Sequence, residues 1–146
     1  MNKSPIRLTT LAWLACFSLA SAAPVRLPMM PVRADTTTFI KLDMILPRRA
    51  HLDAGAPLRW RFAEAWAGFR FTKRKDTVVR PKLPIRIPFQ AAAGVTGARL
   101  VVDLRWCPTP GPQACQDATA DYLVVLNAGA TQTATVVPIA VSVEKQ

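Results

Sequence analysis

Two cysteines, Cys107 and Cys115, have the type and the spacing that could carry out chemistry in this chain. We expect them in a short loop after a strand, because seven residues separate them and three of those residues are prolines. Two thiols this close in an exported protein form a disulfide far more often than they stay free. Such a bond is either a structural staple, which would stabilise the fold by about 2–3 kcal/mol, or a centre that exchanges with other thiols. The spacing alone leaves both roles open.

The expectation of export rests on residues 1–22. Lys3 and Arg7 precede an apolar stretch that is too short to span a bilayer, and Ala20–Ala22 fits the small-x-small rule of signal peptidase. The sequence therefore predicts a signal peptide, cleavage near Ala22, and a periplasmic or secreted protein with no membrane span in the mature chain. The third cysteine, Cys16, lies in this leader, where an incomplete lipobox leaves lipidation as an alternative.

Basic residues outnumber acidic ones by 19 to 9, which gives the chain a formal net charge of +10. The excess is concentrated in residues 48–86, and it is densest between Lys73 and Arg86. In a cytosolic protein this balance would suggest nucleic acid, but export argues against that partner. The charge predicts either an acidic partner or envelope polymer at the Lys73–Arg86 region, or a solvated turn between strands.

The elements that position the cysteines are predicted to be strands, because apolar and polar residues alternate with a period of two. Such alternation or a short apolar run occurs at 40–46, 58–62, 83–89, 100–106, 122–126 and 136–143. About seven strands are expected, and they predict an all-β, two-sheet sandwich over residues 36–146 after an extended lead-in at 23–35. Pro84 and Pro88 cannot donate ladder hydrogen bonds, so their strand is expected at a sheet edge or with a bulge.

Other catalytic and metal-binding patterns are absent from the sequence. His51 is the only histidine, and neither a serine–histidine–aspartate triad nor a glycine-rich phosphate loop is recognisable. We expect His51 in a loop without ligand spacing around it, so no metal and no cofactor is predicted. Acidic residues beside the apolar strands, such as Asp103 and Asp121, alternate outward and are expected on solvated faces. Arg105 could supply a positive field next to Cys107.

Dispersed residues in IKLDMILPRRAHLDAGAPLRWRF, PIRIPF, ARLVVDLRWCPTPGPQACQ and YLVVL resemble the immunoglobulin-like amino-terminal domain of the DsbD transmembrane thiol reductases. A similar layout occurs in the C-terminal β-domain of NHL-repeat thioredoxin-like proteins. The matching positions are Leu46, Pro47, His51, Leu52, Ala56, Pro57, Trp106, Cys107 and Cys115. The chain departs from the pattern at Asp53, where the family favours asparagine, and at 48–50, which replace a glycine-containing approach to the histidine.

The resemblance implies an immunoglobulin-like sandwich in which Cys107 and Cys115 shuttle between dithiol and disulfide. The chain would then be a periplasmic thiol–disulfide carrier, an electron carrier of the thiol:disulfide oxidoreductase type. Its partners would be a thioredoxin-fold protein and a separate membrane thiol reductase. Phe69 and Phe71 are the candidates for a loop that caps the sulfurs. The alternative is a non-catalytic secreted binding module with a structural disulfide and a basic partner-binding edge.

Overall fold

The computed structural model describes residues 23–109 and 114–143, and within them the chain forms eleven strands and no helix. The strands are β1 (Val25–Arg26), β2 (Met30–Arg33), β3 (Thr38–Ile45), β4 (Ala50–Leu52), β5 (Leu58–Ala65), β6 (Phe69–Phe71), β7 (Lys75–Val78), β8 (Ile85–Ala91), β9 (Gly94–Pro108), β10 (Gln116–Gly129) and β11 (Val136–Ser142). The all-β prediction is confirmed, with more strands than expected. The proposed signal peptide and Cys16 lie outside the described residues, which contain no helix suited to crossing a membrane.

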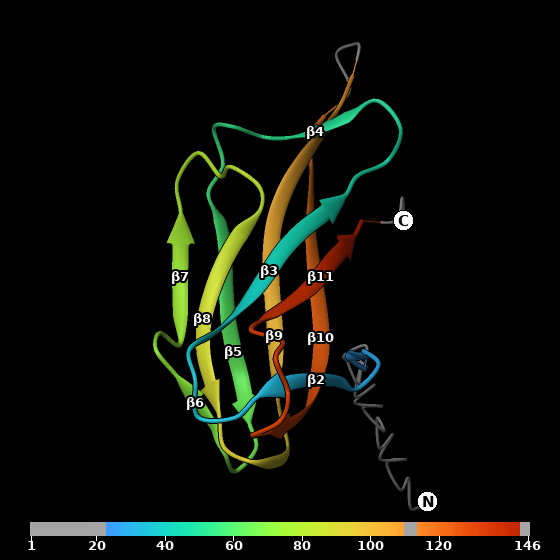
Figure 1. Ribbon diagram of the computed structural model, residues 1–146. Coiled ribbons are helices and arrows are strands. Elements are labelled where there is room, and N and C mark those ends of the chain that lie inside the picture. The colour runs from blue at the N-terminus through green and yellow to red at the C-terminus, as the bar shows by residue number, and fades with distance from the viewer. Residues whose placement is uncertain (1–22, 110–113, 144–146) are drawn as a thin grey trace, which may run out of the picture.

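Two sheets pack face to face in a sandwich (Figure 1). The larger sheet has the order β1-β10-β9-β5-β7, with β2 also paired to β10 and β4 paired to β9. The smaller sheet has the order β11-β3-β8-β6. Both sheets are mixed, because β1 and β2 run parallel to β10, and β11 runs parallel to β3. The expected lead-in at 23–35 therefore contributes two strands to the larger sheet.

The core lies between the sheets and is filled by alternate residues of each strand. On β5, Leu58, Trp60 and Phe62 are buried, whereas the intervening Arg59 and Arg61 are exposed. The same alternation buries Leu100, Val102, Leu104 and Trp106 on β9. Because consecutive strand residues point to opposite faces, the period-two pattern of the sequence becomes one apolar face and one polar face.

An aromatic cluster at one end of the core corrects the expectation of a cap over the cysteines. The ring of Phe62 lies 5.1 Å from that of Phe69 and 5.2 Å from that of Phe71, measured between centroids. Phe69 also stacks on Phe89 of β8 at 5.0 Å. Both candidate cap residues are thus on β6 of the smaller sheet and pack into the core, so the prediction that they shield the sulfurs is wrong.

Strand β8 corrects the expectation for the proline-containing segment. It lies between β3 and β6, and so it is an inner strand of the smaller sheet. Pro84 precedes the strand, and Pro88 pairs with Phe39 of β3. Pairing with β6 covers only Phe89 to Ala91, so Pro88 has a neighbouring strand on one side alone. A strand tolerates a missing N–H at such a position, which explains why proline is compatible with this inner strand.

Strands β9 and β10 are the longest of the fold and form one continuous antiparallel hairpin. Their register runs from Gly94 opposite Ala128 to Trp106 opposite Gln116 without a shift. Figure 1 shows that both strands reach beyond the rest of the sandwich at one end, where β4 pairs with the last residues of β9. We call this end of the hairpin, residues 104–108 and 115–118, the arm. It is the part of the fold that carries both cysteines.

We predict that Phe62→Ala lowers the free energy of unfolding by about 3–5 kcal/mol, because it removes the shared contact of the aromatic cluster and leaves a cavity. Urea denaturation of the purified protein measures the change. The matched control is Val79→Ala, since Val79 is 74% exposed and should change stability by less than about 0.5 kcal/mol. Equal losses in the two variants would contradict this assignment of the core.

Candidate functional site

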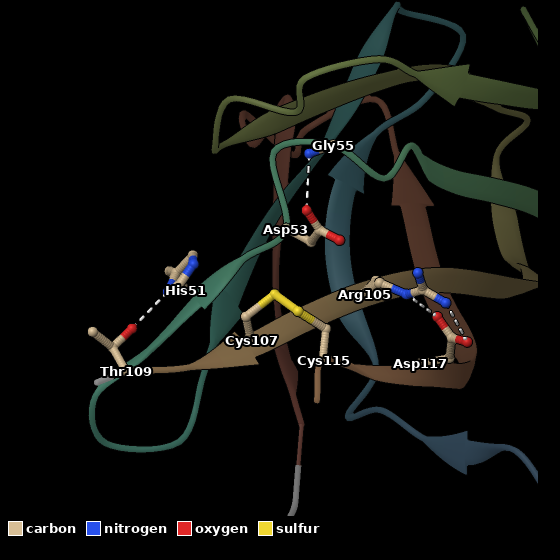
Figure 2. The surroundings of a disulfide bond; sticks show 8 residues. All are labelled: His51, Asp53, Gly55, Arg105, Cys107, Thr109, Cys115 and Asp117. Atoms are coloured by element: carbon tan, nitrogen blue, oxygen red, sulfur yellow. Dashed lines mark hydrogen bonds and ion pairs between the residues drawn. A yellow bond between two sulfur atoms is a disulfide. The ribbon is translucent and has the colours of Figure 1, made fainter. Parts of the chain in front are cut away.

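Cys107 and Cys115 form a disulfide at the end of the hairpin (Figure 2). Their Cα atoms are 4.2 Å apart, which is close to the spacing of directly opposite residues in a non-hydrogen-bonded antiparallel pair. The expected bond is therefore confirmed. Its setting differs from the expected loop, because Cys107 belongs to β9 and Cys115 directly precedes β10. The cysteines extend the ladder of the hairpin by one more pair.

The disulfide lies on the outer face of the larger sheet. Along β9 the side chains alternate, so the neighbouring Trp106 points into the core and is only 3% exposed. Cys107 and Arg105 lie on the opposite, outer face, as Figure 2 shows for the sticks drawn on this strand. Cys115 is the more exposed of the two cysteines. Cys115 is therefore the cysteine that a partner approaching from solvent meets first.

His51 lies directly opposite Cys107, because β4 pairs with the end of β9. The expectation that this histidine occupies a loop is wrong. Its Nδ1 atom is 2.7 Å from the Thr109 hydroxyl, and Figure 2 shows the imidazole directed toward Thr109 rather than toward the sulfurs. The turn before β4 contains Arg49 at φ 59°, a conformation in which non-glycine residues are uncommon. The Arg49 carbonyl accepts a hydrogen bond from the Thr109 N–H, which ties this turn to the arm.

Asp53 is the acidic residue that the fold brings beside the two sulfurs. A carboxylate oxygen of Asp53 and both Sγ atoms lie within 4.8 Å of one another. The backbone N–H of Asp53 donates to the Arg105 carbonyl at 2.9 Å, and its Oδ1 accepts from the Gly55 N–H at 2.9 Å. These two hydrogen bonds hold the carboxylate in place beside the disulfide (Figure 2). The sequence marked Asp53 only as a departure from the DsbD pattern.

Ion pairs cover the outer face of β9 and β10 next to the disulfide. Arg105 donates two hydrogen bonds to Asp117, at 2.8 and 3.1 Å, and Arg99 donates two to Asp121, at 2.9 and 2.6 Å. Asp103 accepts from Arg61 at 2.9 Å. Asp103 and Asp121 thus lie on the solvated face, as predicted.

The charge of Arg105 is matched by Asp117 rather than left free for a thiolate. The hydrogen bond from Arg105 lowers the pKa of Asp117 below its usual value of 3.8. In return the Asp117 carboxylate raises the pKa of Arg105, through its hydrogen bond first and its charge second, with a smaller effect of Asp53. Near the sulfurs there are therefore two carboxylates and one guanidinium, so the positive field expected from Arg105 is largely cancelled.

An open groove on the inner side of the arm does not belong to the disulfide site. It has a volume of about 540 Å³ and is lined mainly by β10, together with Trp106, Tyr122 and the end of β11. Neither cysteine lines it, because both point to the other face of the hairpin.

The site can support chemistry at sulfur. An exposed disulfide can be attacked by a thiolate in line with the S–S bond. A carboxylate close to the sulfurs disfavours a second negative charge, so Asp53 opposes the formation of a thiolate and favours a protonated thiol. Models of known protein families give no match to this chain, and a search of curated proteins gives none either.

We predict that Arg105→Gln raises the pKa of Asp117 toward 3.8, because it removes the hydrogen bond that favours the charged carboxylate. A folded-state pKa below the unfolded value stabilises the protein above the unfolded pKa, and this contribution is lost as the pH falls through the folded pKa. The difference in stability between wild type and variant should therefore shrink at acid pH. NMR titration of the Asp117 side chain measures the pKa. Arg61→Gln is the control, since Arg61 pairs with Asp103 and should leave Asp117 unchanged.

Proposed function

We propose that this protein is a periplasmic thiol–disulfide carrier, in which Cys107 and Cys115 exchange electrons with thioredoxin-fold partners. The observation that carries the proposal is the exposed disulfide at the projecting end of the hairpin, with the Asp53 carboxylate beside both sulfurs. The DsbD resemblance points to the same function. The leader at 1–22 supports export, and a disulfide persists more readily outside the reducing cytosol.

A purely structural role explains the position of the bond less well. The register of β9 and β10 already places the two cysteines opposite each other, and the bond closes a loop with only seven intervening residues. On the chain-entropy model this adds about 2–3 kcal/mol, and the three prolines of the loop already restrict the unfolded chain. A staple also needs no solvent access, whereas exchange requires it.

The exposure of the two cysteines suggests the order of the exchange. A partner thiolate attacks Sγ of Cys115, the S–S bond breaks, and Cys107 leaves with the electron pair of that bond. The departing sulfur takes its proton from solvent, because the Asp53 carboxylate beside it disfavours a second negative charge. The second thiolate of the partner then attacks the partner's own sulfur in the mixed disulfide and releases Cys115. Two electrons have then moved from the partner dithiol to this pair, and the reverse sequence donates them.

We predict that Cys107→Ser accumulates a mixed disulfide through Cys115 when it is mixed with the oxidised form of a thioredoxin-fold partner. In this electron-donating direction Cys107 is the resolving sulfur, and it is missing while the exposed Cys115 thiol remains. The experiment uses the mature protein and a periplasmic thioredoxin-fold protein, with non-reducing electrophoresis as the readout. Cys115→Ser is the matched variant, and it should accumulate several-fold less adduct because Cys107 is less exposed.

The reduction potential of the wild-type pair distinguishes an electron carrier from a structural disulfide. A carrier needs a potential that its partners can reach, whereas structural disulfides of secreted proteins typically lie below about −300 mV. A potential below that range, together with no exchange against the thioredoxin-fold protein, would refute the carrier proposal. The disulfide would then be a staple.

A second candidate function, binding of an acidic partner, is supported by cations at the edge of the larger sheet. Strand β7 forms this edge, and Lys73 pairs with Asp76 at 2.9 Å. Lys75, Arg80 and Lys82 are exposed and have no ion-pair partner within residues 23–109 and 114–143. Exposed cations without a partner attract acidic polymers and acidic protein surfaces.

We predict that the double substitution of Lys75 and Lys82 by glutamate weakens binding to polyglutamate by about tenfold or more, because two attractive charges become repulsive. Fluorescence anisotropy with labelled polyglutamate measures the affinity at two salt concentrations, and higher salt should weaken the wild-type complex. Arg33→Glu, which changes an exposed cation on β2, is the control and should have little effect. Equal weakening by the control would show a nonspecific charge effect instead of a binding edge.

A further inference from the structure

The disulfide site contains three donor groups that become metal ligands when the bond is reduced. Cys107 and Cys115 then offer two thiolates, and Asp53 offers a carboxylate oxygen. These donor atoms already lie within 4.8 Å of one another in the oxidised protein. The sequence spacing hides this group, because four whole strands, β5 to β8, and most of β9 lie between Asp53 and Cys107. The two residues meet only through the pairing of β4 with β9.

From this group of donors we propose that the reduced protein binds one zinc ion through Cys107, Cys115 and Asp53. Zinc accepts thiolate, imidazole and carboxylate ligands in tetrahedral sites. Two soft thiolates together with one hard carboxylate suit this borderline ion better than Cu(I), which favours sulfur, or Mg²⁺ and Ca²⁺, which favour oxygen alone. The exposure of Cys115 leaves the fourth position open to water.

The strands around the disulfide already hold the three proposed zinc ligands near one another. The two cysteines are directly opposite each other with Cα atoms 4.2 Å apart, so both side chains leave the sheet on one face and can meet at one ion. Asp53 is held by the Gly55 and Arg105 backbone, in the way that ligating carboxylates are usually oriented by hydrogen bonds. The negative charge of Asp53 opposes free thiolates but favours a divalent cation between the three groups.

Zinc binding at this site depends on redox state. Reduction of the disulfide consumes two electrons and two protons and gives two thiols. A dithiol supplies both, whereas a phosphine supplies the electrons and becomes a phosphine oxide, with water giving the oxygen and the two protons. Zinc then displaces the thiol protons, since the thiolate is the ligand form of cysteine. The bound ion in turn occupies the sulfur electron pairs that would attack an oxidant, so zinc delays the return to the disulfide. The inference rests on reduction of the pair but not on any thioredoxin-fold partner.

The test is a zinc titration of the mature wild-type protein in competition with a chromogenic chelator. One sample is oxidised, and the other is reduced with a phosphine that supplies no thiol ligand. We expect one zinc per chain in the reduced sample and none in the oxidised sample. Because this comparison needs no substitution, it does not depend on the folding of a variant. Binding of equal strength in the two samples, or one zinc shared by two chains, would overturn the site.

Matched variants identify the ligands in the reduced protein. Asp53→Asn should weaken zinc binding by at least about tenfold, because it removes the charged oxygen ligand. Asp121→Asn removes a carboxylate on the same face that is held by Arg99 and is six residues from Cys115, and it should leave the affinity unchanged. Equal affinity of wild type and Asp53→Asn would overturn the assignment. Exchange with a thioredoxin-fold protein is measured without zinc, so the carrier proposal and the zinc proposal can fail independently.

Discussion

The antiparallel pairing of β9 with β10 is the constraint on which the rest of this structure depends. Its register has no shift, and a slip of one residue would turn every core residue of a strand to solvent. The same register places Trp106 inside and Cys107 outside, and it sets Cys107 opposite Cys115. Strand β5 joins one side of the hairpin, β1 and β2 join the other, and β4 closes its end. Core, disulfide and surface ion pairs therefore follow from one pairing.

Period-two alternation predicted the long strands and the all-β class, because burial of one face leaves a direct signature in the sequence. The short strands β1, β4 and β6 were missed, since a pairing of two or three residues leaves no such signature. The prediction that β8 lies at a sheet edge was wrong for another reason. Proline removes one N–H, so it prevents pairing only on the side of the strand to which that N–H would donate. The disulfide could be predicted from spacing and export. The positions of His51 and Asp53 could not, because they depend on β4 meeting β9 from a distant part of the chain.

The electrostatics of the site differ from those of a cysteine activated by a nearby cation. The guanidinium of Arg105 is bound to Asp117, and the Asp53 carboxylate lies within 4.8 Å of both sulfurs. Such surroundings favour neutral forms of sulfur, either the disulfide or the protonated thiol, over a free thiolate. Two species can remove the repulsion between a free thiolate and the Asp53 carboxylate. A partner thiol forms a covalent bond with the sulfur, and a divalent cation neutralises its negative charge. Both proposals made for this site therefore have one physical origin.

The adjacency of Trp106 and Cys107 on β9 has a practical consequence. The indole is buried, within the core, on the opposite face of the strand from the disulfide. A disulfide quenches the emission of a nearby indole, whereas two thiols quench it less, so opening the bond should brighten Trp106. Within the described residues the other indoles are those of Trp60 and Trp66, both on or next to β5. We therefore expect the emission of Trp106 to follow the state of the cysteine pair without a label.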